Sequence, residues 1–233
     1  MPTVTALLNG YSLSTDQGNP AFCSIVLVES EGRRLVFDFG HVGRRRALRR
    51  VLAERGLEPA DIDTVVLSHG HWDHIQNIDL FDQSRVLVHP AELTFLANPA
   101  GPHTPRWTSS VLAGLTISET AEGEEVLPGV RVIELPGHTP GSIGLTVATD
   151  EGTVVLTGDA VPTLDVLRSG QASGRPTDPE QANASIARVA ALADFVQPGH
   201  DQFLRRNAAG DFETAQARTP LVFSGAGGVK ERV

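Results

Sequence analysis

The sequence is poor in residues that several classes of function require. It has one cysteine, Cys23, and one lysine, Lys230, among 233 residues. A single cysteine cannot form an intrachain disulfide and is compatible with a reducing compartment. Cys23 lies in an apolar run over residues 21–28, so we expect it to be buried in the core. Because the only lysine lies close to the last residue, catalysis through a lysine Schiff base is not expected.

Long hydrophobic runs and an excess of positive charge are also absent. No stretch is apolar and long enough to cross a membrane, and the first residues lack the pattern of a secretory signal. We therefore expect a cytoplasmic protein without a membrane partner. The net charge of −9 disfavours nucleic acid as a partner, although the arginines of residues 44–50 would offer it a local basic surface. Composition leaves the oligomeric state open.

Two common catalytic patterns are missing as well. The chain has no Gly-x-Ser-x-Gly nucleophile elbow and neither of the standard glycine-rich phosphate loops. Nucleophilic serine chemistry of that type and nucleotide binding through such loops are therefore not expected.

Histidine and aspartate occur instead at the ends of predicted strands. An apolar stretch over residues 64–67 runs directly into Ser68-His-Gly-His-Trp-Asp-His74. Three later motifs are Pro-Gly-His-Thr-Pro-Gly-Ser at 136–142, Thr-Gly-Asp at 157–159 and Pro-Gly-His-Asp at 198–201. Five imidazoles and two carboxylates suit two divalent transition ions, Zn²⁺ above all, with Mn²⁺ and Fe²⁺ as alternatives. The candidate ligands are His69, His71, Asp73, His74, His138, Asp159 and His200.

These motifs resemble those of the metallo-β-lactamase fold hydrolases, over about residues 22–205. The resemblance implies an α/β fold, the αββα sandwich, in which helices flank two mixed β-sheets. It implies that a first metal is bound by His69, His71 and His138, and a second by Asp73, His74 and His200. Asp159 would bridge the two. Many members continue the first motif with x-Gly-Gly, whereas here Ile75 is followed by Gln76 and Asn77.

Hydrophobic periodicity by itself predicts a mixed order of elements. Thr177 and Glu180 form a capping-box signature for the last helix. Residues 98–125 and 161–176 have no clear period and are expected to be loops. We expect one hydrolase domain over residues 1–207 and a partly loose segment over 208–233, with a loose tail from 225. The predicted strands are 22–28, 34–39, 64–68, 85–88, 130–135, 143–149, 153–157 and 195–196, and the predicted helices are 44–55, 90–97 and 178–194.

A dinuclear zinc site would carry its own nucleophile. Two metals about 3.5–4 Å apart can share a hydroxide and stabilise both the attacking and the leaving oxygen, and zinc lowers the pKa of bound water to about 7. Asp73 is expected to be catalytic as well, by shuttling a proton. Trp72, His103 and Trp107 are candidate substrate-binding residues, the last two because long loops such as 98–125 are often functional.

The substrate is not determined by these motifs. Asp159 argues against β-lactam hydrolysis, because true β-lactamases of this family usually have a cysteine or another residue there. The favoured reaction is attack of metal-bound hydroxide on the carbonyl of a small ester, lactone or thioester. Residues 158–160 and 199–201 resemble N-acyl-homoserine lactonases, but Val161 and Pro162 stand where those enzymes often have a tyrosine. The alternatives are a phosphodiesterase or ribonuclease, which residues 73–81 resemble locally, an iron-dependent oxygenase, and a metal-binding protein without hydrolytic activity.

Overall fold

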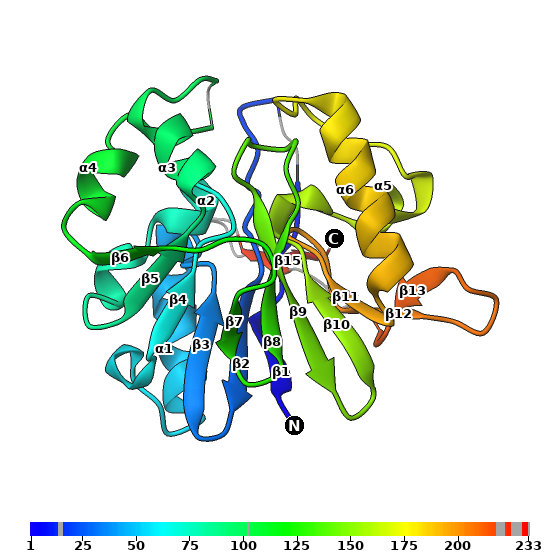
Figure 1. Cartoon of the computed structure of the whole chain (residues 1–233), viewed down its shortest axis with the longest axis horizontal. Helices are drawn as coiled ribbons and strands as arrows, with labels where there is room; N and C mark the ends of the chain where they lie inside the picture. Colours follow the sequence, from blue (N-terminus) through cyan, green and yellow to red (C-terminus); the bar gives the residue numbers. More distant parts are fainter. Residues whose placement is uncertain (14–15, 102, 218–221, 225–229, 233) are drawn as a thin grey trace.

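Two β-sheets lie face to face between two layers of helices (Figure 1). The computed structural model describes residues 1–13, 16–101, 103–217, 222–224 and 230–232. Helices α1, α3 and α4 belong to the side of the first sheet, and α5 and α6 to the side of the second (Figure 1). The predicted αββα sandwich is therefore confirmed.

The first sheet is built from the first half of the chain. Its amino-terminal strands are antiparallel neighbours, and from β3 onward the neighbours are parallel. Parallel pairing puts the carboxyl ends of β3, β4 and β5 at one edge, where connecting loops can meet. In spatial order the strands are β1 (Thr3–Leu8), β2 (Ile25–Ser30), β3 (Arg33–Phe37), β4 (Thr64–Val66), β5 (Arg85–Val88) and β6 (Thr116–Glu119).

The second sheet is built from the second half. All its neighbours are antiparallel except β10 and β11, which are parallel, so this sheet is mixed too. A separate pair, β14 (Val222–Ser224) and β15 (Lys230–Arg232), is antiparallel. In spatial order the seven strands are β13 (Phe212–Thr214), β12 (Leu204–Arg206), β11 (Phe195–Gln197), β10 (Gly152–Leu156), β9 (Ile143–Thr149), β8 (Val130–Glu134) and β7 (Glu125–Leu127).

The helices are short, apart from α6. No helix within the described ranges is both long and apolar enough to cross a membrane. The α-helices are α1 (Arg45–Ala53), α2 (Trp72–Ile75), α3 (Pro90–Ala97), α4 (Thr108–Leu112), α5 (Leu164–Ser169) and α6 (Pro179–Leu192), and the 3₁₀ turns are η1 (Val42–Arg44), η2 (Pro59–Asp61), η3 (Ile78–Leu80) and η4 (Gly158–Ala160).

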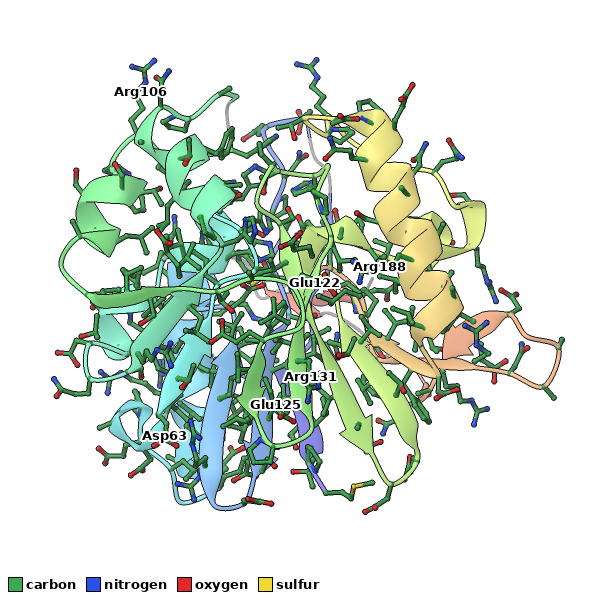
Figure 2. The ribbon with its side chains drawn as sticks, viewed as in Figure 1. Asp63, Arg106, Glu122, Glu125, Arg131 and Arg188 are labelled. Carbon is green, nitrogen blue, oxygen red and sulfur yellow. The ribbon has the colours of Figure 1, made fainter. Side chains whose placement is uncertain are left out.

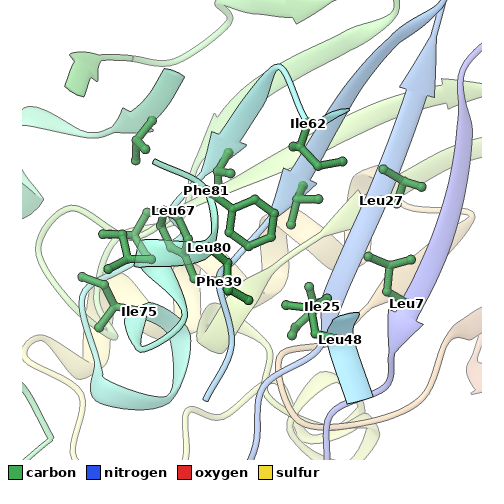
Figure 3. Close-up of a cluster of buried hydrophobic side chains, with 14 of the residues drawn as sticks. Leu7, Ile25, Leu27, Phe39, Leu48, Ile62, Leu67, Ile75, Leu80 and Phe81 are labelled. Carbon is green, nitrogen blue, oxygen red and sulfur yellow. The ribbon is translucent and has the colours of Figure 1, made fainter. Parts of the chain in front are cut away.

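Alternating side chains divide the hydrophobic core into three layers. In β2, Ile25 and Leu27 pack toward Leu48 of α1, within a cluster drawn in Figure 3. Their neighbours Val26 and Val28 point the other way, toward side chains of the second sheet. The far face of the second sheet packs against α5 and α6. Three separate layers of this kind are what two sheets covered on both outer faces require.

The structure corrects several sequence-based expectations. The segment 98–125 was expected to be a loop but contains α4, β6 and the first residue of β7. The segment 161–176 contains α5. The cap of α6 is Asp178, whose carboxylate accepts hydrogen bonds from the amides of Glu180 and Gln181, so the capping box at Thr177 is not formed. Strands β1, β7, β12, β13, β14 and β15 were not predicted either.

The carboxyl-terminal part contributes to the second sheet beyond the predicted boundary at residue 207. Strand β13 pairs with β12 in register from Leu204 to Arg206. Within the expected loose tail from residue 225, residues 230–232 form β15, which pairs with β14, and residues 225–229 and 233 lie outside the described residues. The domain limits therefore stay a prediction, and the strand pairing is an observation.

Candidate metal centre

The seven candidate ligands are carried by loops and short turns that follow strands of both sheets. The first motif follows β4 and ends in the one-turn helix α2. His138 lies after β8, Asp159 lies in η4 after β10, and His200 lies after β11. The loops therefore converge from two sheets on one rim of the sandwich.

Four side chains form a first group in which the donor atoms all lie within 4.8 Å of one another: His69, His71, His138 and Asp159. Nδ1 of His71 is 3.0 Å from Nε2 of His138. Oδ2 of Asp159 is 3.5 Å from the same Nε2 and 3.9 Å from Nε2 of His69. Three imidazoles and a carboxylate thus point at one small volume.

A second group is formed by Asp73, His74 and His200, again within 4.8 Å. Oδ2 of Asp73 lies 3.4 Å from Nε2 of His200 and 3.8 Å from Nε2 of His74. The other oxygen of Asp159, Oδ1, lies 3.3 Å from Nε2 of His74 and 3.2 Å from Nε2 of His200. The Asp159 carboxylate is therefore positioned between the two groups.

Several polar atoms of these groups are buried without a hydrogen-bond partner among the described residues. They are Nε2 of His69, Nε2 of His74, Oδ2 of Asp73 and Oδ1 of Asp159. A buried polar atom without a partner costs free energy, about 1–3 kcal/mol each, so a native protein rarely leaves four together. Nitrogen and carboxylate oxygen in this arrangement are the donors that zinc binds. The donor set therefore fits a divalent metal.

The pKa values divide the histidines into two kinds. Burial, together with neighbouring imidazoles, holds the pKa of His69 well below its usual value and lowers that of His71 to about 2. Burial also lowers the pKa of His138. All three are therefore neutral at pH 7, which is the form that binds a metal.

The remaining two histidines lie against carboxylates. Burial alone would lower the pKa of His200, but Asp159 and Asp73 raise it to about 9. Burial opposes a similar rise at His74, where the carboxylates of Asp159 and Asp38 raise the pKa well above the usual value. Conversely, His200 and His74 hold the pKa of Asp159 well below its usual range despite its burial. The second group thus attracts positive charge.

Asp38 holds His74 in place and was not predicted from the sequence. Its Oδ2 is 2.8 Å from Nδ1 of His74, and it accepts hydrogen bonds from the amide and the hydroxyl of Ser68, both at 2.8 Å. Asp38 has φ of 66°, which aspartate and asparagine tolerate better than most residues. A signal existed in the sequence: Asp38 directly follows the buried strand β3.

Glu92 connects two of the ligand loops and was also missed. Its buried carboxylate accepts hydrogen bonds from the amide of Gly70 at 2.8 Å, the hydroxyl of Thr139 at 2.6 Å and the amide of Gly141 at 3.2 Å. Gly70 lies between His69 and His71, and Thr139 follows His138. One side chain of α3 therefore fixes the loops of three candidate ligands. An acidic residue in the first turn of a helix is common, so the position of Glu92 carries no specific signal.

Glycine is required next to His200. A Cβ at Gly199 would lie 2.2 Å from Oδ1 of Asp159 and 2.7 Å from the carbonyl oxygen of Gly158. Only glycine lets the His200 loop approach Asp159 this closely. The Pro-Gly-His pattern noted in the sequence has here a steric cause.

Cys23 is buried as expected. Its thiol donates a hydrogen bond to the carbonyl of Asp73 at 3.2 Å, and burial raises its pKa to about 11. It groups with Asp38 and His74, but both of those are already bonded to each other. Cys23 is therefore a neutral thiol that supports the loop of the first motif.

The two groups open into a cleft of about 720 Å³. Of the candidate substrate-binding residues, Trp72 and His103 line it, and the backbone amide of Trp72 donates to the carbonyl of His103 at 3.0 Å. Trp107, at the start of α4, is 46% exposed and is not brought to the described cleft wall. Further lining residues are Ala21, Phe95, Ala100, Pro162 and Arg175.

Comparison with known sequences identifies the family. The sequence profile of the Metallo-beta-lactamase superfamily matches residues 18–200, which contain all seven candidate ligands. The chain belongs to this superfamily. The order and spacing of its motifs, read from the sequence alone, led to the same family, and the two helix-flanked mixed sheets agree with it.

Individual relatives include enzymes and proteins named only by their domain. Metallo-beta-lactamase domain-containing protein 1 of Xenopus laevis is 32% identical over 208 residues, covering 85% of this chain and 79% of the frog protein. An N-acyl homoserine lactonase of a Bacillus species is 31% identical over 157 residues, covering 65% of this chain and 60% of the lactonase. A Thermotoga maritima structure described as a metallo-beta-lactamase superposes with a TM-score of 0.72 at 25% identity, over 88% of this chain and 99% of that one. Superfamily membership and the His/Asp cluster together support a metal-dependent hydrolase.

Proposed function

We propose that this protein is a dinuclear zinc hydrolase that cleaves the acyl bond of a small ester, lactone or thioester. The observation that carries the proposal is the position of the Asp159 carboxylate between the two donor groups. Its Oδ2 lies 3.5 Å from Nε2 of His138 and its Oδ1 lies 3.3 Å from Nε2 of His74, while Nε2 of His200 lies 3.2 Å from both oxygens. A bridging carboxylate of this kind suits a pair of metals better than a single ion.

In this proposal His69, His71 and His138 would hold the first metal, Asp73, His74 and His200 would hold the second, and Asp159 would serve both. Zinc is favoured by the imidazole-rich donor set, with Mn²⁺ and Fe²⁺ as alternatives. When bound, two such ions supply an acidic water molecule and polarise the substrate carbonyl.

The side chains of the protein would then orient the substrate and transfer a proton from the attacking water. Trp72 and His103 form part of the cleft wall against which the acyl group would lie. Asp73 lines the cleft, and in this proposal it accepts a proton from the attacking water besides helping to hold the second metal. The water oxygen bonds to the carbonyl carbon, the bond from that carbon to oxygen or sulfur breaks, and the leaving group takes up the proton.

The named function of the Bacillus relative supports acyl hydrolysis, since a lactone is a cyclic ester. The arginines of residues 44–50, in η1 and α1, give little support to the phosphodiesterase alternative. Arg44 donates to the carbonyls of Asn9 and Cys23, and Arg45 pairs with Asp79, so both have structural roles. Arg46, Arg49 and Arg50 are exposed on α1, and none of them lines the described cleft.

The test is a hydrolysis panel on the zinc-loaded protein, with a lactone, a thioester, a β-lactam and a phosphodiester. We expect the lactone or the thioester to be cleaved fastest, and His71→Ala to reduce that rate by at least about 100-fold, because one of the three imidazoles of the first group is lost. Preferential cleavage of the phosphodiester would reject acyl hydrolysis. One iron per chain together with oxygen consumption would reject a hydrolase altogether.

Replacing Glu92 with glutamine tests how the first metal is held. The glutamine amide cannot accept from Gly70, Thr139 and Gly141 together, so the loops of His71 and His138 should loosen. We expect zinc affinity at the first site to fall about 10-fold or more, as is usual when a residue that orients metal ligands is changed. A competition titration with a chromophoric chelator measures this. Glu151→Gln, at an exposed turn, is the matched control, and equal affinities in the two variants would contradict the role of Glu92.

A further inference from the structure

The described wall of the cleft carries one charged side chain besides the candidate metal ligands, and it is Arg175. The rest of that wall is apolar or neutral, with Trp72, Phe95, Ala21 and Pro162 among its members. The protein as a whole has a net charge of −9. A positively charged side chain in the cleft of a protein with a net negative charge suggests a role in binding.

The loop that carries Arg175 is fixed on both sides. After it, the amide of Thr177 donates to the carbonyl of His138 at 3.2 Å, and the Thr177 hydroxyl donates to the carbonyl of Gly137 at 2.9 Å. Before it, the amide of Ala172 donates to the side chain of Asn183 in α6 at 2.8 Å. Two residues span at most about 7 Å, so the backbone of Arg175 is tethered close to the His138 loop. Pro176 restricts the backbone further.

The guanidinium of Arg175 has neither an ion-pair nor a hydrogen-bond partner in the described part of the chain, and the residue is exposed and belongs to the cleft lining. Arg188 and Arg131, in contrast, pair with Glu122 and Glu125 at 2.7 and 3.0 Å (Figure 2). A planar guanidinium with free donors binds a carboxylate or phosphate through two parallel hydrogen bonds.

We propose that Arg175 forms a subsite for an anionic oxygen group of the substrate, a carboxylate or a phosphate, at the end of the acyl chain remote from the cleaved bond. This inference rests on the proposed hydrolase function and narrows it to acidic esters or thioesters. Two divalent ions would carry more positive charge than the carboxylates of Asp73 and Asp159 neutralise. The floor of the cleft would then be positive, which also favours substrates with an anionic group.

The test compares esters that share a leaving group and an acyl length. 4-Nitrophenyl valerate ends in a methyl group, and mono(4-nitrophenyl) glutarate ends in a carboxylate at the same position. A third ester ends in a phosphate, and the spontaneous rate of each is subtracted. We expect the zinc-loaded enzyme to prefer one of the two anionic esters in kcat/KM, and the preferred one identifies the group.

Arg175→Gln should reduce the ratio of kcat/KM for the anionic ester to kcat/KM for the neutral ester about 10-fold. The change should appear mainly in KM, because the variant loses the hydrogen bonds between the guanidinium and the anionic group of the ester. Arg175→Lys should retain part of the ratio. The matched control is Arg106→Gln, because Arg106 is exposed, points outward at the periphery (Figure 2) and is not part of the described cleft wall. A preference that survives Arg175→Gln, or no preference while the neutral ester is cleaved, would overturn the subsite and leave the hydrolase proposal standing.

Binding of glutarate gives a second readout that does not need turnover. Calorimetry on the zinc-loaded protein should show weaker binding of glutarate to Arg175→Gln than to Arg106→Gln. Equal affinities would overturn the subsite even if none of the three esters were a substrate. Cleavage of none of them would count against the hydrolase proposal alone.

Discussion

Changing Asp159 to asparagine is expected to reduce hydrolysis by at least about 1,000-fold. The amide carries no charge and offers one oxygen, so it cannot direct an anionic oxygen at both donor groups. A metal pair stabilises the transition state by several kcal/mol, and each 1.36 kcal/mol corresponds to a factor of ten in rate. The loss should appear in kcat, and metal analysis by mass spectrometry should find fewer than two zinc ions per chain.

The matched control for this variant is Asp82→Asn. Asp82 is exposed in a turn after η3 and lies outside the described cleft wall. It removes the same charge from the protein without touching the donor groups. If Asp159→Asn kept both the metal content and the rate of the control, the two-metal assignment would be wrong.

Substitutions of Asp38 are also expected to have large effects, and two of them separate its roles. Asparagine tolerates the φ of 66°, so the backbone should be retained. Its amide nitrogen, however, would donate to Nδ1 of His74 and force the imidazole proton onto Nε2, the atom that faces the cluster. We expect Asp38→Asn to fold normally but to bind the second zinc about 10- to 100-fold more weakly, measured by chelator competition.

Alanine at the same position should affect folding itself. It removes the partner of the buried His74 and leaves the amide and hydroxyl of Ser68 without their acceptor. Loss of one member of a buried charged pair costs about 3–5 kcal/mol, so urea denaturation of the metal-free Asp38→Ala protein should show a correspondingly lower stability. If the asparagine and alanine variants had equal stability, the buried interactions of Asp38 would not be what holds this loop.

The ligand motifs could be predicted because each consists of a few adjacent residues. His69 to His74 follow an apolar strand directly, and the glycines beside His138, Asp159 and His200 mark turns. Asp38 and Glu92 could not be assigned a role in the same way, because their partners are distant in sequence: Asp38 bonds Ser68 and His74, and Glu92 bonds Gly70 and Gly141. Arg175 is similar, since its place in the cleft depends on contacts that join Thr177 to the His138 loop.

The secondary structure shows the same division. Strand β9, with seven residues, was predicted with the observed limits, because periodicity needs several residues to be visible. The limits of α3, which begins at Pro90, were predicted as well. Helix α5 was not predicted, because its six residues are too few to show a period. Thr163 at its start and Gly170 after its end are ordinary cap residues, but they did not reveal it. Strand β6 was hidden in a segment rich in serine, threonine and glycine, and it forms because β5 offers it a parallel neighbour.

The arrival of ligands from both sheets has a thermodynamic consequence. His69 to His74 belong to the rim of one sheet, and His138, Asp159 and His200 to the rim of the other, so a bound ion would fasten the two halves of the sandwich together. Such an ion stabilises the folded chain by an amount that grows with its concentration, about 4 kcal/mol at 1,000 times its dissociation constant. The lifetime of this protein against unfolding and proteolysis would then follow the zinc supply of its surroundings, independently of any substrate.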